Sequence, residues 1–166
     1  MMNAFRFDTR ITIGAVPSGE DFDQLRSLGY KTLVDVRDPK EKFGQAVERA
    51  AATHSITYVS IPVDRSQITI ENVVDFYRAV FRKGSAPIYA FSRFGRRPLA
   101  FLLLFDAVRG DKALRDVFSS ASGFGLNLEE DECLHSFLVA FFRNPDYRRI
   151  VDSIRDLRPD LFDQGT

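Results

Sequence analysis

Short apolar segments alternate with amphipathic ones along the first two thirds of the chain. Stretches rich in β-branched or apolar residues predict strands over 11–13, 32–36, 57–61 and 87–91. Helical patterns between them cover about 18–28, 45–53 and 69–84. Ser18, with Asp21 three places on, and Thr69 are the expected helix caps. This alternation predicts an α/β fold, with a central, mostly parallel sheet flanked by helices.

After Gly110 only helical patterns remain, over 112–120, 128–142 and 145–157. We therefore expect an α/β domain at 1–125 and a helical C-terminal extension at 126–166, packed on the same domain. An apolar stripe with helical spacing runs along the second of these helices and consists of Leu134, Phe137, Leu138, Phe141 and Phe142. Such a stripe more often packs in the core, in this chain against the sheet or against Ile150 and Ile154. The alternative is a homodimer through the C-terminal helices.

The fourth predicted strand runs into a cationic loop, Ser92-Arg93-Phe94-Gly95-Arg96-Arg97, and then into a helical segment. Backbone N–H groups at the start of a helix lack internal partners and favour an oxyanion. The three arginines add full charges, and the planar fork of Arg97 is suited to two oxygens of a phosphate or sulfate. Gly95 permits the turn, and Pro98 fits the first helical turn. An ordinary surface turn with solvated arginines is the alternative.

This loop resembles the active loop of the cysteine-dependent phosphatases and the rhodanese sulfurtransferases, in its shorter form Cys-x-x-Gly-x-Arg. The chain resembles in particular the phosphatase-like domain of the beta-lactamase-hydrolase-like protein family. Further segments in matching order are 13–22, 33–37 with Glu41 after it, 58–63 and 121–128. The resemblance implies a dual-specificity or tyrosine phosphatase-like fold.

The resemblance also implies roles for individual residues. Ser92 stands at the nucleophile position, Arg97 would hold the phosphate oxygens, and Asp64 would protonate the leaving oxygen. The remaining loop residues, Arg93, Phe94, Gly95 and Arg96, would complete the phosphate-binding loop. Asp64 also suits an ordinary turn, Asp-Arg-Ser. Arg37 and Glu41 would form an ion pair that orients the loop, or an exposed pair of little consequence.

Two departures from the family pattern concern the chemistry. Serine replaces the nucleophilic cysteine, and Phe91 replaces the usual histidine before it. A serine hydroxyl needs a general base, and the sequence places neither His54 nor His135 beside Ser92. We expect an inactive protein as written, either a pseudo-phosphatase or a chain whose cysteine was exchanged for serine. A rhodanese-like sulfurtransferase and a non-catalytic module that binds a phospho-ligand are the alternatives.

Composition limits the remaining possibilities. With 166 residues, 45% of them hydrophobic, the chain can bury a substantial core. Lys plus Arg equal Asp plus Glu at 23 each, which gives no general attraction to nucleic acid or to anionic membranes. The expected partner is a phosphate or sulfate oxyanion, free or on a phosphorylated protein or small molecule.

Cys133 is the only cysteine, which excludes an internal disulfide, and its helical setting predicts a small packed residue. Two histidines and one cysteine offer little to a transition metal, so neither a metal nor a cofactor is expected. The N-terminus lacks the apolar run of a signal peptide, and the apolar stretch 98–105 is too short to span a bilayer. These features predict a soluble, cytoplasmic protein.

Overall fold

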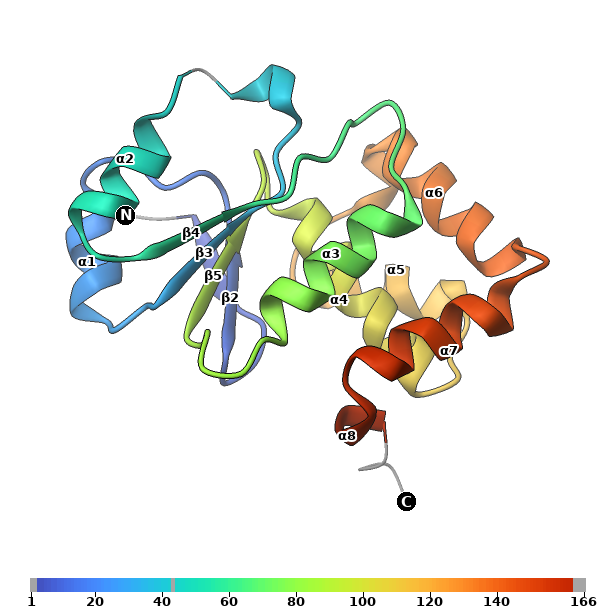
Figure 1. Ribbon diagram of the computed structural model, residues 1–166. Helices are drawn as coiled ribbons and strands as arrows, with labels where there is room; N and C mark the ends of the chain where they lie inside the picture. The colour runs from blue at the N-terminus through green and yellow to red at the C-terminus, as the bar shows by residue number, and fades with distance from the viewer. Residues whose placement is uncertain (1–2, 43, 163–166) are drawn as a thin grey trace.

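A five-stranded sheet forms one half of the molecule in the computed structural model, which describes residues 3–42 and 44–162 (Figure 1). Its strands are β1 (Ala4–Arg6), β2 (Ile11–Gly14), β3 (Thr32–Asp35), β4 (Thr57–Ser60) and β5 (Ile88–Phe91). They are ordered β1-β2-β5-β3-β4, and every neighbouring pair is parallel except β1 with β2. The predicted, mostly parallel α/β sheet is confirmed, while the short edge strand β1 was not predicted.

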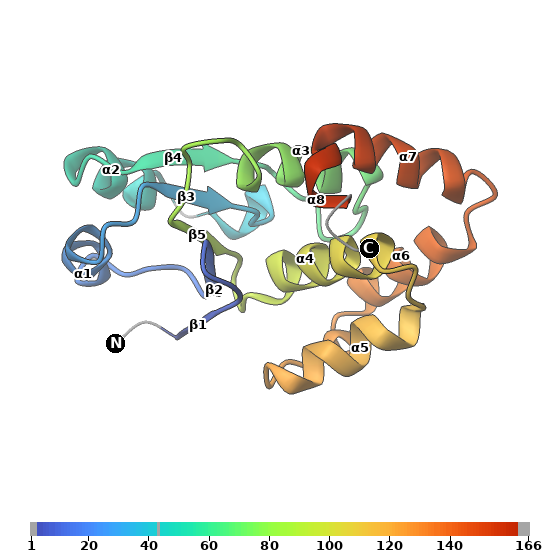
Figure 2. The ribbon, with the colours of Figure 1, turned by 90° about the horizontal axis from the view of Figure 1, so that it is seen from below.

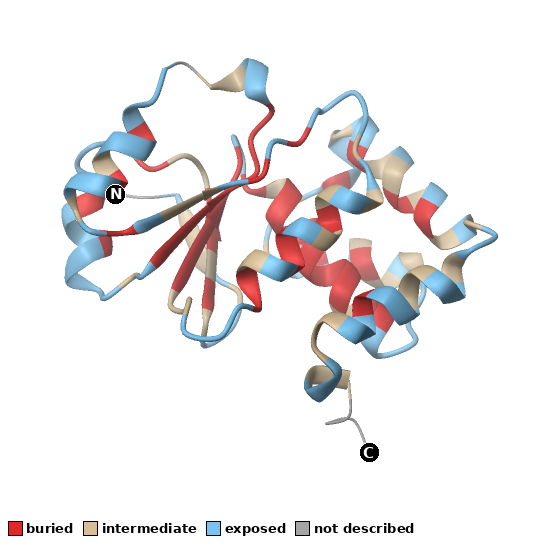
Figure 3. Ribbon diagram, in the orientation of Figure 1, coloured by how far each residue is buried: buried red, intermediate tan, exposed pale blue. Residues whose placement is uncertain are grey.

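Helices cover both faces of the sheet. On one face lie α1 (Asp21–Ser27) and α2 (Ala46–Thr53), which pack through Phe22, Leu25, Val47 and Ala51 against Leu33 and Tyr89 of the strands. On the other face lie α3 (Ile70–Val80) and α4 (Arg96–Arg109), and their apolar residues share a core with the opposite side of β2, β3 and β5. Figure 3 shows the central strands and α4 as the most continuously buried elements. Burial on both faces explains why β5 is apolar throughout and why Leu33 and Val34 form the centre of β3.

The rest of the chain is helical and gathers around α4, away from α1 and α2 (Figure 2). It comprises α5 (Leu114–Gly123), α6 (Glu132–Arg143), α7 (Tyr147–Leu157) and α8 (Pro159–Phe162), with a short 3-10 turn at η2 (Leu128–Glu130). A second such turn, η1 (Pro39–Glu41), lies between β3 and α2. The apolar stripe of α6 is core, because Leu134, Leu138 and Phe141 are buried together with Ile154 of α7. A homodimer through these helices stays a prediction. No helix among the described residues is long and apolar enough to cross a membrane.

Two helix starts illustrate how capping works in this chain. Thr69 caps α3 as predicted: its hydroxyl accepts the N–H of Asn72, and the Asn72 side chain accepts the N–H of Thr69. Ser18 is not a cap. Its N–H and hydroxyl both donate to Asp21 Oδ2, at 2.7 and 2.9 Å, and α1 begins only at Asp21. The predicted pair of residues is present, but its hydrogen bonds stabilise a turn before the helix, and the N-cap residue, Glu20, makes no side-chain cap hydrogen bond.

Candidate oxyanion-binding site

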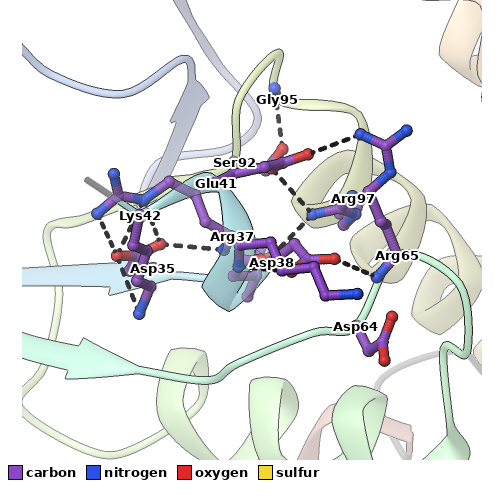
Figure 4. A network of polar contacts seen from close by, with 12 residues as sticks. Asp35, Arg37, Asp38, Glu41, Lys42, Asp64, Arg65, Ser92, Gly95 and Arg97 are labelled. Atoms are coloured by element: carbon purple, nitrogen blue, oxygen red, sulfur yellow. Dashed lines mark hydrogen bonds and ion pairs between the residues drawn. The ribbon is translucent and has the colours of Figure 1, made fainter.

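The parallel strands end at one edge of the sheet, and the candidate site is built from the loops that follow them. The register pairs Asp35 of β3 with both Phe91 of β5 and Ser60 of β4, and it pairs Gly14 of β2 with Phe91. Four strand ends therefore lie level. The segments that the sequence analysis singled out around Ser92 and Asp64 leave from β5 and β4, and Figure 4 shows them side by side with the loop after β3. Ligands of open α/β sheets bind at this edge.

The loop from Ser92 to Arg97 wraps around the N-terminus of α4. Gly95 is the residue before the helix and has φ +82°, a left-handed conformation that favours glycine. Ser92 is 3% exposed, and its Oγ accepts the Gly95 N–H at 3.1 Å. Within the described part of the chain, no backbone or side-chain acceptor takes the N–H groups of Phe94, Arg96 or Arg97. The loop therefore has free donors at a helix start, as an oxyanion site requires.

Replacing Gly95 with alanine is expected to destabilise the protein and to distort the loop. A Cβ at Gly95 would lie 3.2 Å from the Gly14 carbonyl oxygen, in addition to the cost of the positive φ, and together these cost about 1–3 kcal/mol of unfolding free energy. Gly29 is the matched control, because it has φ +81° and open space around its Cβ position. Urea denaturation should show a larger loss for Gly95→Ala than for Gly29→Ala. Equal losses would mean that the contact with Gly14 has no energetic role.

Arg97 lies under the loop and is 6% exposed. Its Nη1 is 3.5 Å from the Val36 carbonyl oxygen and 3.7 Å from Glu41 Oε2, which are long contacts for a guanidinium. The buried Arg97 Nε and Glu41 Oε2 have no hydrogen-bond partner among the described residues. Leaving a buried charged donor unsatisfied is costly. Arg97 is thus held in place with donor capacity to spare, beside the free N–H groups of the loop.

The other two arginines of the loop lie nearer the surface. Arg93 and Arg96 both place their guanidinium groups over the ring of Phe94, at 5.0 and 5.3 Å from its centroid. Phe94 itself is 55% exposed at the rim of the loop. Arg96 also forms a 2.6 Å ion pair with Glu130 of η2. Arg97 is therefore the buried cation of the loop, whereas Arg93 and Arg96 lie at its periphery.

The predicted pair of Arg37 with Glu41 is wrong, because Arg37 pairs with Asp35 instead. Its Nε and Nη2 donate to the two oxygens of Asp35, at 3.0 and 2.8 Å. Tyr58 donates its hydroxyl proton to the same carboxylate. Burial alone would raise the pKa of Asp35, but the hydrogen bonds from Arg37 and Tyr58 bring it below its usual value. Glu41 turns instead to Arg65, at 3.4 Å, and to Arg97.

The loop after β4 is anchored by Asp38, a buried residue to which the sequence analysis gave no role. Its carboxylate accepts the backbone N–H of Arg65 at 2.9 Å and that of Lys40 at 2.8 Å. This contact joins the β3 and β4 loops. A carboxylate right after a predicted strand was the only signal in the sequence, and it resembles an ordinary strand-end charge.

Asp64 lies beside this anchor, at the margin of the network in Figure 4, and is exposed. It accepts the Ser66 hydroxyl at 2.6 Å and the Ser66 N–H at 2.8 Å, and these bonds lower its pKa. Asp64 lines a cavity of about 650 Å³ that also touches Arg65 and Arg93, whereas Ser92 lines a neighbouring one. The structure therefore brings Asp64 near the loop but not into the same cavity as Ser92.

The cavity over Ser92 has a volume of about 400 Å³, and the side chains around it are Glu41, Arg65, Ser92, Arg93, Phe94, Arg96, Arg97, Glu130, Asp131, Glu132 and Cys133. The expectation that Cys133 is a packed residue is wrong, because it is exposed at the start of α6 and faces this cavity. Neither histidine reaches it. His54 lies between the Ala50 carbonyl and Asp23, and His135 lies against Phe118.

Solved structures share this fold at low sequence identity. P. aeruginosa TpbA, in a cysteine-to-serine form in complex with pTyr, is 14% identical with a TM-score of 0.72 and covers 93% of this chain and 91% of its own. The core catalytic domain of the PP-IP phosphatase SIW14 from S. cerevisiae, in complex with citrate, is 15% identical with a TM-score of 0.68 and covers 95% and 94%. Identities this low show the fold alone.

A sequence relative and a family model extend the comparison. The beta-lactamase hydrolase-like protein of Agrobacterium fabrum is 29% identical over 152 residues, which are 85% of this chain and 35% of that protein. The chain thus spans about a third of the relative's length. The family model described as a DSP-PTPase phosphatase fused to NAD+ kinase matches residues 3–98, from the first strand into α4 and through the whole of the loop at Ser92. Since the match covers more than half of the sequence, this chain belongs to that DSP-PTPase phosphatase family.

Proposed function

We propose that this chain is a phosphatase-like protein that binds the phosphate group of an ester at the loop from Ser92 to Arg97. The proposal rests on Arg97, a buried guanidinium whose Nε has no partner among the described residues, next to N–H groups at the start of α4 that are likewise free there. A phosphate oxygen is the acceptor that such donors suit best. Arg97 holds two of the oxygens, and the N–H groups of Phe94, Arg96 and Arg97, which have no acceptor among the described residues, hold the others.

Ser92 stands where the family has its cysteine, directly under the bound phosphate. Its Oγ accepts the Gly95 N–H, an arrangement that would stabilise a thiolate but does little for a neutral hydroxyl. Neither histidine is in contact with Ser92, so no general base of that type is at hand among the described residues. We therefore propose that the protein binds phosphate esters and turns them over negligibly. Asp64 takes the place of the acid, and its role requires a cysteine at position 92.

The ligands of the structural neighbours support an oxyanion partner. TpbA was crystallised with pTyr and the SIW14 domain with citrate, both of which carry clustered anionic oxygens. In this chain the exposed ring of Phe94 lies at the rim of the cavity. An aryl phosphate would place its ring near that side chain, so a phosphotyrosine-type ester is the ligand that we propose. The sulfurtransferase alternative lacks a sulfur nucleophile at position 92.

Calorimetric titration with inorganic phosphate tests this function. We expect saturable binding that Arg97→Met weakens by at least about tenfold, since charge-assisted hydrogen bonds to a buried guanidinium are lost. Arg78→Met is the matched control, because Arg78 is exposed on α3 and its ion pair is with Asp75, at 3.2 Å, away from the cavity over Ser92. Equal binding by the wild-type chain and Arg97→Met would show that phosphate is not held here.

A further inference from the structure

Both cationic and anionic side chains line the cavity over Ser92. The loop after β5 contributes Arg93, Arg96 and Arg97, the arginine wall, while η2 and the start of α6 contribute Glu130, Asp131 and Glu132, the acidic wall. In all, four arginines and four carboxylates line this cavity. Carboxylates in this lining disfavour a ligand that is anionic throughout, because like charges repel in a partly desolvated cavity.

The three acids of this wall are not equally free. Glu130 is paired with Arg96 at 2.6 Å, and Asp131 caps α6 by accepting the Leu134 N–H at 3.0 Å. Glu132 lies exposed on the first turn of α6, and its carboxylate forms no ion pair or hydrogen bond with other residues that the structure describes. Glu132 is therefore the carboxylate of this wall that is available to a ligand.

A buried donor in the lining of the cavity fixes where the ligand's phosphate would lie. Arg97 lines the cavity, is 6% exposed, and has an Nε without a partner in the described chain. That buried donor calls for an anionic oxygen at the floor of the cavity. The volume of about 400 Å³ leaves room above a phosphate for neighbouring groups of the ligand, which would then meet Glu132 and Asp131.

We propose that this cavity selects phosphotyrosine peptides in which a basic residue adjoins the phosphotyrosine. The inference rests on the proposed function, since the phosphate must first be bound at Arg97. The phosphate then contacts the arginine wall while the ammonium or guanidinium of the neighbouring residue contacts the acidic wall, chiefly Glu132. A peptide with a flanking acidic residue would bring two carboxylates together and bind more weakly.

Three phosphotyrosine peptides that differ only in the flanking residues, Lys, Ala or Glu, test the proposal by fluorescence polarisation. Because single exposed charge pairs contribute modestly, we expect the lysine peptide to bind at least about threefold more tightly than the glutamate peptide at low salt. Glu132→Gln should remove most of that preference. Glu129→Gln is the matched control: it removes the same charge from the adjacent turn η2, at an exposed residue that does not line the cavity.

The outcomes separate this inference from the proposed function. If all three peptides and inorganic phosphate bind equally well with and without Glu132, the phosphate site stands and the selectivity is refuted. A preference that Glu129→Gln lowers as much as Glu132→Gln would likewise overturn it, because the effect would then be one of overall charge. If inorganic phosphate itself fails to bind, the proposed function and this inference both fall.

Discussion

Replacing Ser92 with cysteine is expected to raise the turnover of an aryl phosphate by at least about 100-fold, because a neutral hydroxyl becomes an ionised nucleophile. At a helix N-terminus beside arginines, the pKa of a cysteine thiol falls from about 8.5 to about 3.5–7.5. The structure supplies both conditions, since Ser92 Oγ already accepts the Gly95 N–H before α4 and Arg97 lies beneath the loop. Release of p-nitrophenol from p-nitrophenyl phosphate measures the effect.

Cys133 calls for a specific control in this experiment, because it is exposed and faces the same cavity. The Ser92→Cys change should be made both alone and with Cys133→Ser, and the two proteins should be equally active. Cys133→Ser alone should leave the low activity of the serine form unchanged. If Ser92→Cys still binds phosphate but hydrolyses nothing, Ser92 does not stand at the nucleophile position. High activity of the unaltered chain would point instead to a base-assisted serine.

Much of the fold could be read from the sequence because buried parallel strands have a strong signature. The segments at Thr32–Asp35 and Ile88–Phe91 are buried along their whole length, and each is followed by a polar or cationic loop. The strand β1 escaped prediction since it is only three residues long and forms a half-buried edge. The start of α1 was misjudged because a serine and an aspartate three residues apart satisfy either a helix cap or a preceding turn, and only tertiary packing decides between them.

The site was less predictable than the fold, since its charges pair across loops that are distant in sequence. The loop at Ser92 is contiguous, so the pattern alone placed Gly95 and Arg97 correctly. By contrast, Arg37 has Asp35 two residues away and Glu41 four residues away, and only the geometry of the strand end favours Asp35. The acidic wall at Glu132 comes from the last third of the chain. Nothing local to α6 indicates that its first turn shares a cavity with the loop after β5.

In a Ser92→Cys background, Asp64→Asn is expected to lower aryl phosphate turnover by at least about tenfold, since general acid catalysis contributes 10²–10⁴-fold. Phosphate binding should be nearly unchanged, because Asp64 lines the neighbouring cavity. The bonds from Ser66 keep the pKa of Asp64 below its usual value, so the carboxylate is almost wholly ionised at neutral pH. The protonated acid becomes tenfold scarcer with each pH unit above that pKa. Turnover of the cysteine form should therefore fall as pH rises from about 5 to 7, and Asp64→Asn should flatten that slope.

The same variants discriminate between phosphate hydrolysis and sulfur transfer, because the two leaving groups differ. Phosphate ester cleavage expels an alkoxide or phenoxide that gains from a proton, whereas transfer of sulfur from thiosulfate to a thiolate expels sulfite, which has no comparable need. Ser66→Ala supplies a further check, because it removes the hydroxyl that donates to Asp64 at 2.6 Å. The pKa of Asp64 should then rise, and phosphatase turnover of the cysteine form at neutral pH should increase. If the cysteine form instead moves sulfur from thiosulfate to cyanide, ignores aryl phosphates and is indifferent to both changes, the phosphatase assignment of this site is wrong and a sulfurtransferase must replace it.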